Sequence, residues 1–79
     1  MPVENNLLER AKPELLKAIA VCEIDYPGTA KYVKDELSNN FGVSYLTYGV
    51  LCDIRSMCIA AKMEFDLNNP WKLFNDYKK

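Results

Sequence analysis

Apolar residues recur at steps of three and four positions along most of this chain, which is the period of an amphipathic helix. In the segment 6–24 the apolar stripe consists of Leu7, Leu8, Ala11, Leu15, Ala18, Ile19 and Cys22. Pro13 lies off this stripe, where it either kinks one helix or begins a new one, and Glu14 suits the positive end of a helix dipole. The pattern predicts an N-terminal helical face that is bent or restarted at Pro13.

A second amphipathic segment follows a predicted turn. The turn is the sequence Asp-Tyr-Pro-Gly at 25–28, in which proline restricts the residue before it and precedes a permissive glycine. Thr29 is the expected N-cap of the next helix. The inward stripe of this helix consists of Ala30, Val33 and Leu37. The asparagine pair at 39–40 with Gly42 predicts its end.

The third segment, 44–63, is apolar on nearly its whole circumference. Ser44 is the expected N-cap, and Leu51, Ile54 and Cys58 are expected in the core. A helix that is apolar on most sides must be buried on most sides, either within one monomer or against a second copy or a partner. Gly49 would permit close approach of another backbone.

The C-terminal segment, 64–79, is consistent with two structures. Residues 62–67 alternate polar and apolar as a strand does, which would give the hairpin of a winged helix. Asn69 as N-cap, Pro70 at the first helical position and the helical spacing of the aromatic residues favour a short helix. These aromatic residues are Trp71, Phe74 and Tyr77. We favour the helix, with Trp71 and Phe74 covering part of the central helix.

These segments predict one domain over residues 1–79, of the all-α class, with three or four packed helices and a helix-turn-helix-like unit. A winged helix with a C-terminal β-hairpin is the alternative. The 79 residues include ten Lys and Arg and eleven Asp and Glu, for a net charge of −1. The basic residues are interleaved with acids, which disfavours a protein whose affinity comes mainly from contacts to phosphate.

The chemistry of the side chains predicts neither catalysis nor a cofactor. The chain has no histidine, three cysteines without a Cys-x-x-Cys pair and no glycine-rich phosphate loop. Asp53 next to Cys52 would disfavour a thiolate nucleophile. We therefore expect no enzyme and no metal site. Buried, unpaired cysteines and the absence of a signal or membrane-spanning stretch lead us to expect a reducing, cytoplasmic setting.

The segment 34–51, KDELSNNFGVSYLTYGVL, places apolar and small residues where a helix-turn-helix unit needs them. The residues expected inside or at the turn of this unit are Leu37, Phe41, Gly42, Val43, Tyr48 and Leu51. The Phe-Gly-Val-Ser turn at 41–44 resembles that of helix-turn-helix regulators of bacteria and phages. The resemblance implies DNA binding through phosphate contacts and groove contacts. The implied phosphate contacts are Thr29, Lys31 and Lys34, and the implied groove contacts are Ser44, Tyr45 and Thr47.

The chain departs from such regulators where a recognition helix reads DNA. Ser38 stands where alanine is usual, and Tyr45, Leu46, Gly49 and Val50 stand where Arg, Lys, Asn or Gln contact base edges and phosphates. The excess of apolar residues instead favours a protein-binding module. The predicted partner-binding residues are Tyr45, Leu46, Tyr48, Gly49 and Val50.

The partner is expected to be another protein or a second copy forming a homodimer, with no membrane and no small-molecule substrate. A regulator or inhibitor of the phage or mobile-element type is the specific hypothesis. A DNA-binding transcriptional regulator with a helix-turn-helix or winged helix is the alternative.

Overall fold

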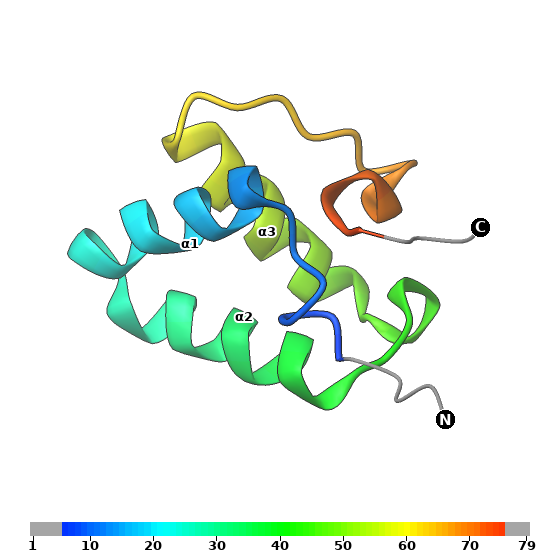
Figure 1. The fold of residues 1–79 in the computed structure, drawn as a ribbon. Helices are drawn as coiled ribbons and strands as arrows, with labels where there is room; N and C mark the ends of the chain where they lie inside the picture. The colour runs from blue at the N-terminus through cyan, green and yellow to red at the C-terminus, as the bar shows by residue number, and fades with distance from the viewer. Residues whose placement is uncertain (1–5, 76–79) are drawn as a thin grey trace.

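The computed structural model describes residues 6–75 and consists of helices and their connections (Figure 1). Three α-helices of 13 residues each are α1 (Pro13–Asp25), α2 (Pro27–Asn39) and α3 (Tyr48–Ala60). Two short 3₁₀ helices are η1 (Val43–Tyr45) and η2 (Pro70–Leu73). No strand occurs in residues 6–75, where the single β-type pairing is an isolated bridge between Ala11 and Phe74. The predicted all-α class is confirmed.

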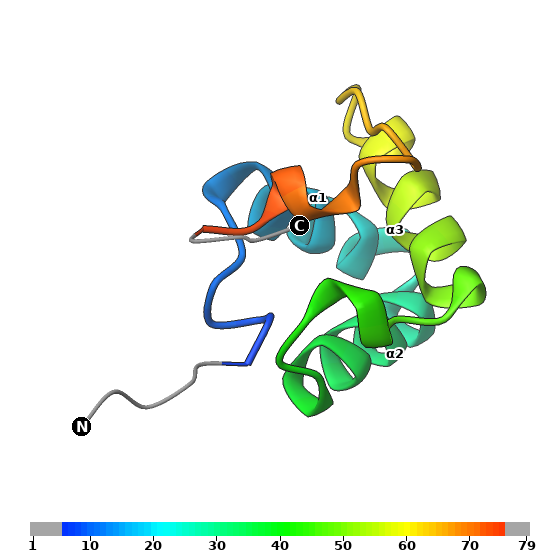
Figure 2. The same cartoon turned by 90° about the vertical axis from the view of Figure 1, so that its right-hand side faces the viewer.

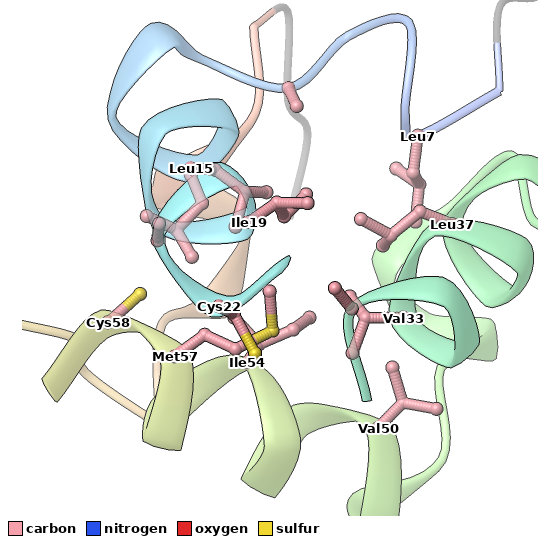
Figure 3. Packing of buried hydrophobic residues seen from close by; sticks show 14 of the residues in the cluster. Leu7, Leu15, Ile19, Cys22, Val33, Leu37, Val50, Ile54, Met57 and Cys58 are labelled. Atoms are coloured by element: carbon pink, nitrogen blue, oxygen red, sulfur yellow. The ribbon is translucent and has the colours of Figure 1, made fainter. Parts of the chain in front are cut away.

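Pro13 begins a helix rather than kinking one. It occupies the first turn of α1, followed by Glu14, where a missing N–H leaves no hydrogen bond unmade. The preceding residues form turns that cross the end of α2, because the Leu7 N–H donates to the Asn40 carbonyl at 2.9 Å. Leu7 is fully buried beside Leu37 (Figure 3). The N-terminal segment is therefore part of the core.

One residue, Tyr26, joins α1 to α2 and serves as the C-cap of the first and the N-cap of the second. Pro27 is the first residue of α2, so the prediction of Thr29 as N-cap is wrong by three positions. Proline supplies the helical φ and lacks the N–H that a cap would satisfy, which makes a later start unnecessary. The short corner lays α1 and α2 side by side (Figure 1).

The start of α3, in contrast, is later than predicted. The Val50 N–H donates to the Thr47 hydroxyl at 3.3 Å, so Thr47 is the N-cap and Ser44 lies within η1. The connection between α2 and α3 therefore covers residues 40–47. The buried positions of α3 are Val50, Ile54, Met57 and Cys58, which share one face of the helix.

The end of α3 is closed by a residue in the left-handed conformation. Lys62 has φ 59°, its N–H donates to the Ile59 carbonyl at 2.9 Å, and the Met63 N–H donates to the Cys58 carbonyl at 2.8 Å. This pair of bonds is a Schellman motif with lysine at the position that usually holds glycine. The helix ends at Ala60, three residues before the predicted Met63.

The hydrophobic core lies where the three helices meet (Figure 3). The predicted core residues Ile54 and Cys58 are buried, whereas Leu51 is half-buried at the edge of the core. Phe41 and Tyr48, predicted to face inward, are 49% and 68% exposed, and this prediction is wrong. The enclosure of α3 is incomplete, because Tyr48 and Ile59 of this helix are exposed.

The C-terminal segment forms the predicted short helix, as the 3₁₀ helix η2, with Asn69 at the N-cap and Pro70 in its first turn. Phe74 is buried and Trp71 is half-buried. The Lys12 N–H donates to the Leu73 carbonyl at 2.9 Å, so this segment packs beside the start of α1 (Figure 2). Residues 64–75 contain no hairpin, and Tyr77 lies outside the described residues.

Candidate partner-binding surface

Three aromatic side chains project from the connection between α2 and α3 and from the first residue of α3. Phe41, Tyr45 and Tyr48 are 49%, 75% and 68% exposed. We refer to these three residues as the aromatic surface. Buried tyrosine and phenylalanine are ordinary core residues, whereas three exposed rings within eight positions leave a large apolar area in water. This density of exposed rings makes the connection the candidate site.

The connection between α2 and α3 is anchored by a buried side chain and by hydrogen bonds to its backbone. Leu46 is 8% exposed and packs in the core, and its N–H donates to the Val43 carbonyl at 3.0 Å. The Arg10 guanidinium donates to the Phe41 carbonyl at 2.8 Å. At Gly42, an added Cβ would lie 3.4 Å from the ring of Tyr45. The backbone therefore has a defined conformation under the exposed rings, which lowers the entropy lost on binding.

The predicted partner-binding residues divide into two groups. Tyr45, Tyr48 and Gly49 are exposed. Leu46 and Val50 are 8% and 0% exposed and belong to the monomer's own core, so they contribute no side-chain surface to a partner. The correction follows from the helical spacing of Val50, which lies four residues before buried Ile54 and seven before buried Met57, and from the 3₁₀ turn that precedes buried Leu46.

Phe41 belongs to the surface although the sequence pattern placed it inside. The pattern continued the phase of α2 through Phe41, but α2 ends at Asn39 and Asn40 has extended backbone, with ψ 143°. A residue beyond that break no longer follows the helical stripe of Leu37. The asparagine pair before Phe41 was the available signal that the phase is lost there.

Three of the six implied DNA contacts have side-chain partners within this fold. The Lys31 ammonium lies 2.9 Å from the Asp35 carboxylate, and the Lys34 ammonium lies 3.1 Å from the Glu23 carboxylate. The Thr47 hydroxyl caps α3. Ser44 and Tyr45 are exposed. The positive charges available for phosphate are thus partly neutralised by neighbouring acids.

The three cysteines are free thiols, and two of them are buried. Burial raises the pKa of Cys58 to about 11 and also raises the pKa of Cys22, to which Asp53, Asp25 and Glu23 add. Both thiols are therefore protonated at neutral pH, unlike a nucleophile or a metal ligand. Within residues 6–75 there is no group of three or more His, Cys, Asp or Glu placed to hold a metal ion.

No helix in the described part of the chain combines the length and the apolar composition needed to cross a bilayer. Comparison with protein-family models, with curated proteins and with solved structures gives no match to this chain.

Proposed function

We propose that this protein is a binding module that engages another protein, or a second copy of itself, through the aromatic surface. The observation that carries the proposal is the exposure of Phe41, Tyr45 and Tyr48 on a connection anchored by Leu46. Tyrosine and phenylalanine supply much of the binding energy of protein interfaces, because a large rigid ring is buried at a small cost in entropy. A net charge of −1 and paired lysines favour a protein partner over nucleic acid.

Gly49 gives the proposal a second support. An added Cβ there would meet nothing closer than the Thr47 hydroxyl oxygen at 3.9 Å, so the monomer itself does not need glycine at this position. Gly28 occupies the corresponding second position of α2 and also has open space around it. Glycine beside two exposed tyrosines suits the close approach of a partner's backbone.

In cellular terms, we propose a regulator or inhibitor of the phage or mobile-element type, acting by contact with its target protein. DNA binding through the helix-turn-helix resemblance is the competing function. It predicts binding that is tight at about 50 mM salt and falls steeply with added salt. Fluorescence anisotropy with duplex DNA separates the two functions directly.

The test of the binding surface is a double variant, Tyr45→Ser with Tyr48→Ser. Association is measured by size-exclusion chromatography with light scattering for self-association, and by affinity capture with quantitative mass spectrometry for other partners. Tyr32→Ser is the matched control, because Tyr32 is a 45% exposed tyrosine within α2 and is not one of the three residues of the aromatic surface. We expect the double variant to weaken association by about 30-fold or more and the control to leave it unchanged.

Gly49→Ala and Gly28→Ala refine the test. Both should stabilise the monomer slightly, by up to about 1 kcal/mol, since alanine is the better helix former. Only Gly49→Ala should weaken association. Association that survives the tyrosine double variant would place the binding surface elsewhere, and DNA binding that collapses with salt would replace the proposed function.

A further inference from the structure

A hollow is lined by residues from the end of α1, from the start of α2 and from α3. Its volume is 460 Å³. Val21, Met57 and Ala60 contribute an apolar lining from α1 and α3. The hydroxyls of Thr29 and Ser56 also line it. None of the residues of the aromatic surface takes part, so this is a separate feature of the molecule.

Two carboxylates line the hollow without a partner of their own. Asp25 and Asp53 both line it, and neither carboxylate has a hydrogen bond or a salt bridge within residues 6–75. Glu23 differs, because its carboxylate is paired with the ammonium of Lys34. The described fold thus leaves two negative charges uncompensated at one apolar depression.

The end of α1 adds to this negative field. Asp25 is the last residue of the helix, and the last turn contains no basic residue. Acids at a C-terminus are unfavourable, because the carbonyl groups there already carry partial negative charge. Cys22, which also lines the hollow, responds to both carboxylates, since Asp53 and Asp25 add to burial in raising the pKa of its thiol. Both charges therefore act on the same small region.

We infer that this hollow binds an arginine side chain of a protein partner. The methylene stem would lie on Val21, Met57 and Ala60, and the guanidinium would lie between Asp25 and Asp53. Arginine fits this chemistry because its stem is apolar and its planar head has five N–H donors for carboxylates. The inference rests on the proposed function in one respect, that the ligand is part of a protein.

The test is an amide NMR titration of the full chain with N-acetylarginine amide as the probe. N-acetylcitrulline amide is the control probe, because it has nearly the same shape and no charge. At about 50 mM salt, where screening is weak, we expect saturable shifts at Thr29, Asp53 and Ser56 with the arginine probe and at least about fivefold weaker binding of the citrulline probe. Equal responses to both probes, or no saturable response, would overturn the inference.

Charge variants locate the site. Asp53→Asn and Asp25→Asn should each weaken binding of the arginine probe by about 3- to 10-fold, with amide spectra that remain dispersed. Asp35→Asn is the control, since it removes one carboxylate from α2 outside the hollow. If Asp35→Asn weakens binding of the arginine probe as much as the other two variants do, the attraction is a general effect of charge. If calcium ions cause the same shifts as the arginine probe, the hollow is a cation site without preference for arginine. Either result overturns the inference.

The double variant Tyr45→Ser, Tyr48→Ser separates this inference from the proposed function. It should bind the arginine probe as the native chain does, because neither tyrosine lines the hollow. Failure of the arginine titration leaves the association test of the aromatic surface intact. Loss of the arginine response in the double variant would contradict the separation of the two features and overturn the assignment of the probe to the hollow.

Discussion

Replacing Lys62 with glycine should stabilise this protein. Lys62 follows α3 with φ 59°, a conformation in which the Cβ of an L-residue approaches its own backbone. The two hydrogen bonds that close the helix, from the N–H groups of Lys62 and Met63, require this conformation. The strain is therefore retained in the native state because the helix end depends on it.

The size of the effect follows from two opposing terms. The left-handed conformation costs a residue with a Cβ about 1 to 2 kcal/mol, which glycine avoids. Glycine also gives the unfolded chain more freedom, which lowers stability by about 0.5 to 1 kcal/mol. The net expectation for Lys62→Gly is a gain of about 0.5 to 1 kcal/mol in the free energy of unfolding.

Two further variants at the same position separate backbone conformation from charge. Lys62→Ala removes the ammonium and keeps the Cβ, so the free energy of unfolding should change by less than about 0.5 kcal/mol. Lys62→Asn should lie between alanine and glycine, because asparagine adopts the left-handed region more readily than other residues with a Cβ. The expected order of stability is glycine, asparagine, then alanine.

Urea denaturation followed by circular dichroism measures this order. With a slope of about 1 kcal/mol per molar urea for a domain of this size, Lys62→Gly should raise the midpoint by about 0.5 to 1 M. A glycine variant less stable than the alanine variant would refute the reasoning. That result would mean that the helix end is not held by the left-handed residue.

Three other predictions concern the core, the thiols and an exposed turn. Ile54→Ala should reduce the free energy of unfolding, measured by urea denaturation, by about 2 to 4 kcal/mol, because Ile54 is buried. Ile59→Ala, at a 60% exposed position of the same helix, should change it by less than about 1 kcal/mol. Similar losses in the two variants would contradict the packing of α3. Burial raises the pKa of Cys58 to about 11, so iodoacetamide at neutral pH should alkylate the half-buried Cys52 before Cys58. Peptide mass mapping that finds Cys58 modified first would be inconsistent with the burial of Cys58. Hydrogen bonds from the Asn69 side chain and the Asn68 backbone lower the pKa of Asp66, so the stability that its carboxylate contributes is present above the unfolded pKa and is lost as pH falls through the folded pKa. The difference in melting temperature between the native chain and Asp66→Asn should therefore shrink in acid. A difference that stays constant with pH would exclude this linkage.

The helical pattern was sufficient to predict the body of each helix. Side-chain spacing identified Leu15, Ile19, Val33, Leu37 and Ile54 as inward positions, and all are buried. This agreement has a simple cause, because an uninterrupted helix keeps one face toward its neighbours and the sequence records that face every three or four residues.

The first residues of α2 and α3 were predicted wrongly, because the sequence offers more than one suitable N-cap near each helix start. Ser44 and Thr47 are both good N-caps, and only the fold shows that Thr47 is used. Thr29 was likewise expected to cap α2, but this helix begins two residues earlier, at Pro27. An error of three residues in a start assigns to the helix residues that lie outside it, so Tyr45 and Leu46 do not follow the helical spacing of α3.

The candidate surface could be predicted in part. Tyr45 and Tyr48 were expected at a partner surface and are exposed, whereas Leu46 and Val50 were expected there and belong to the core. The hollow could not be predicted, because Asp25 and Asp53 are far apart in sequence and line the same hollow only through the packing of α1 against α3. The spacing of apolar residues indicates the inward face of each helix, but it does not indicate which residues of two different helices lie close together.

The most direct test of the central claim is site-specific photo-crosslinking in cells. A benzophenone amino acid is placed at position 48 in one variant and at position 32 in another, both of which are exposed tyrosine positions. We expect a discrete protein adduct from position 48 and none from position 32. Adducts from position 32 alone, or no adduct from position 48, would contradict the claim that the aromatic surface binds a protein.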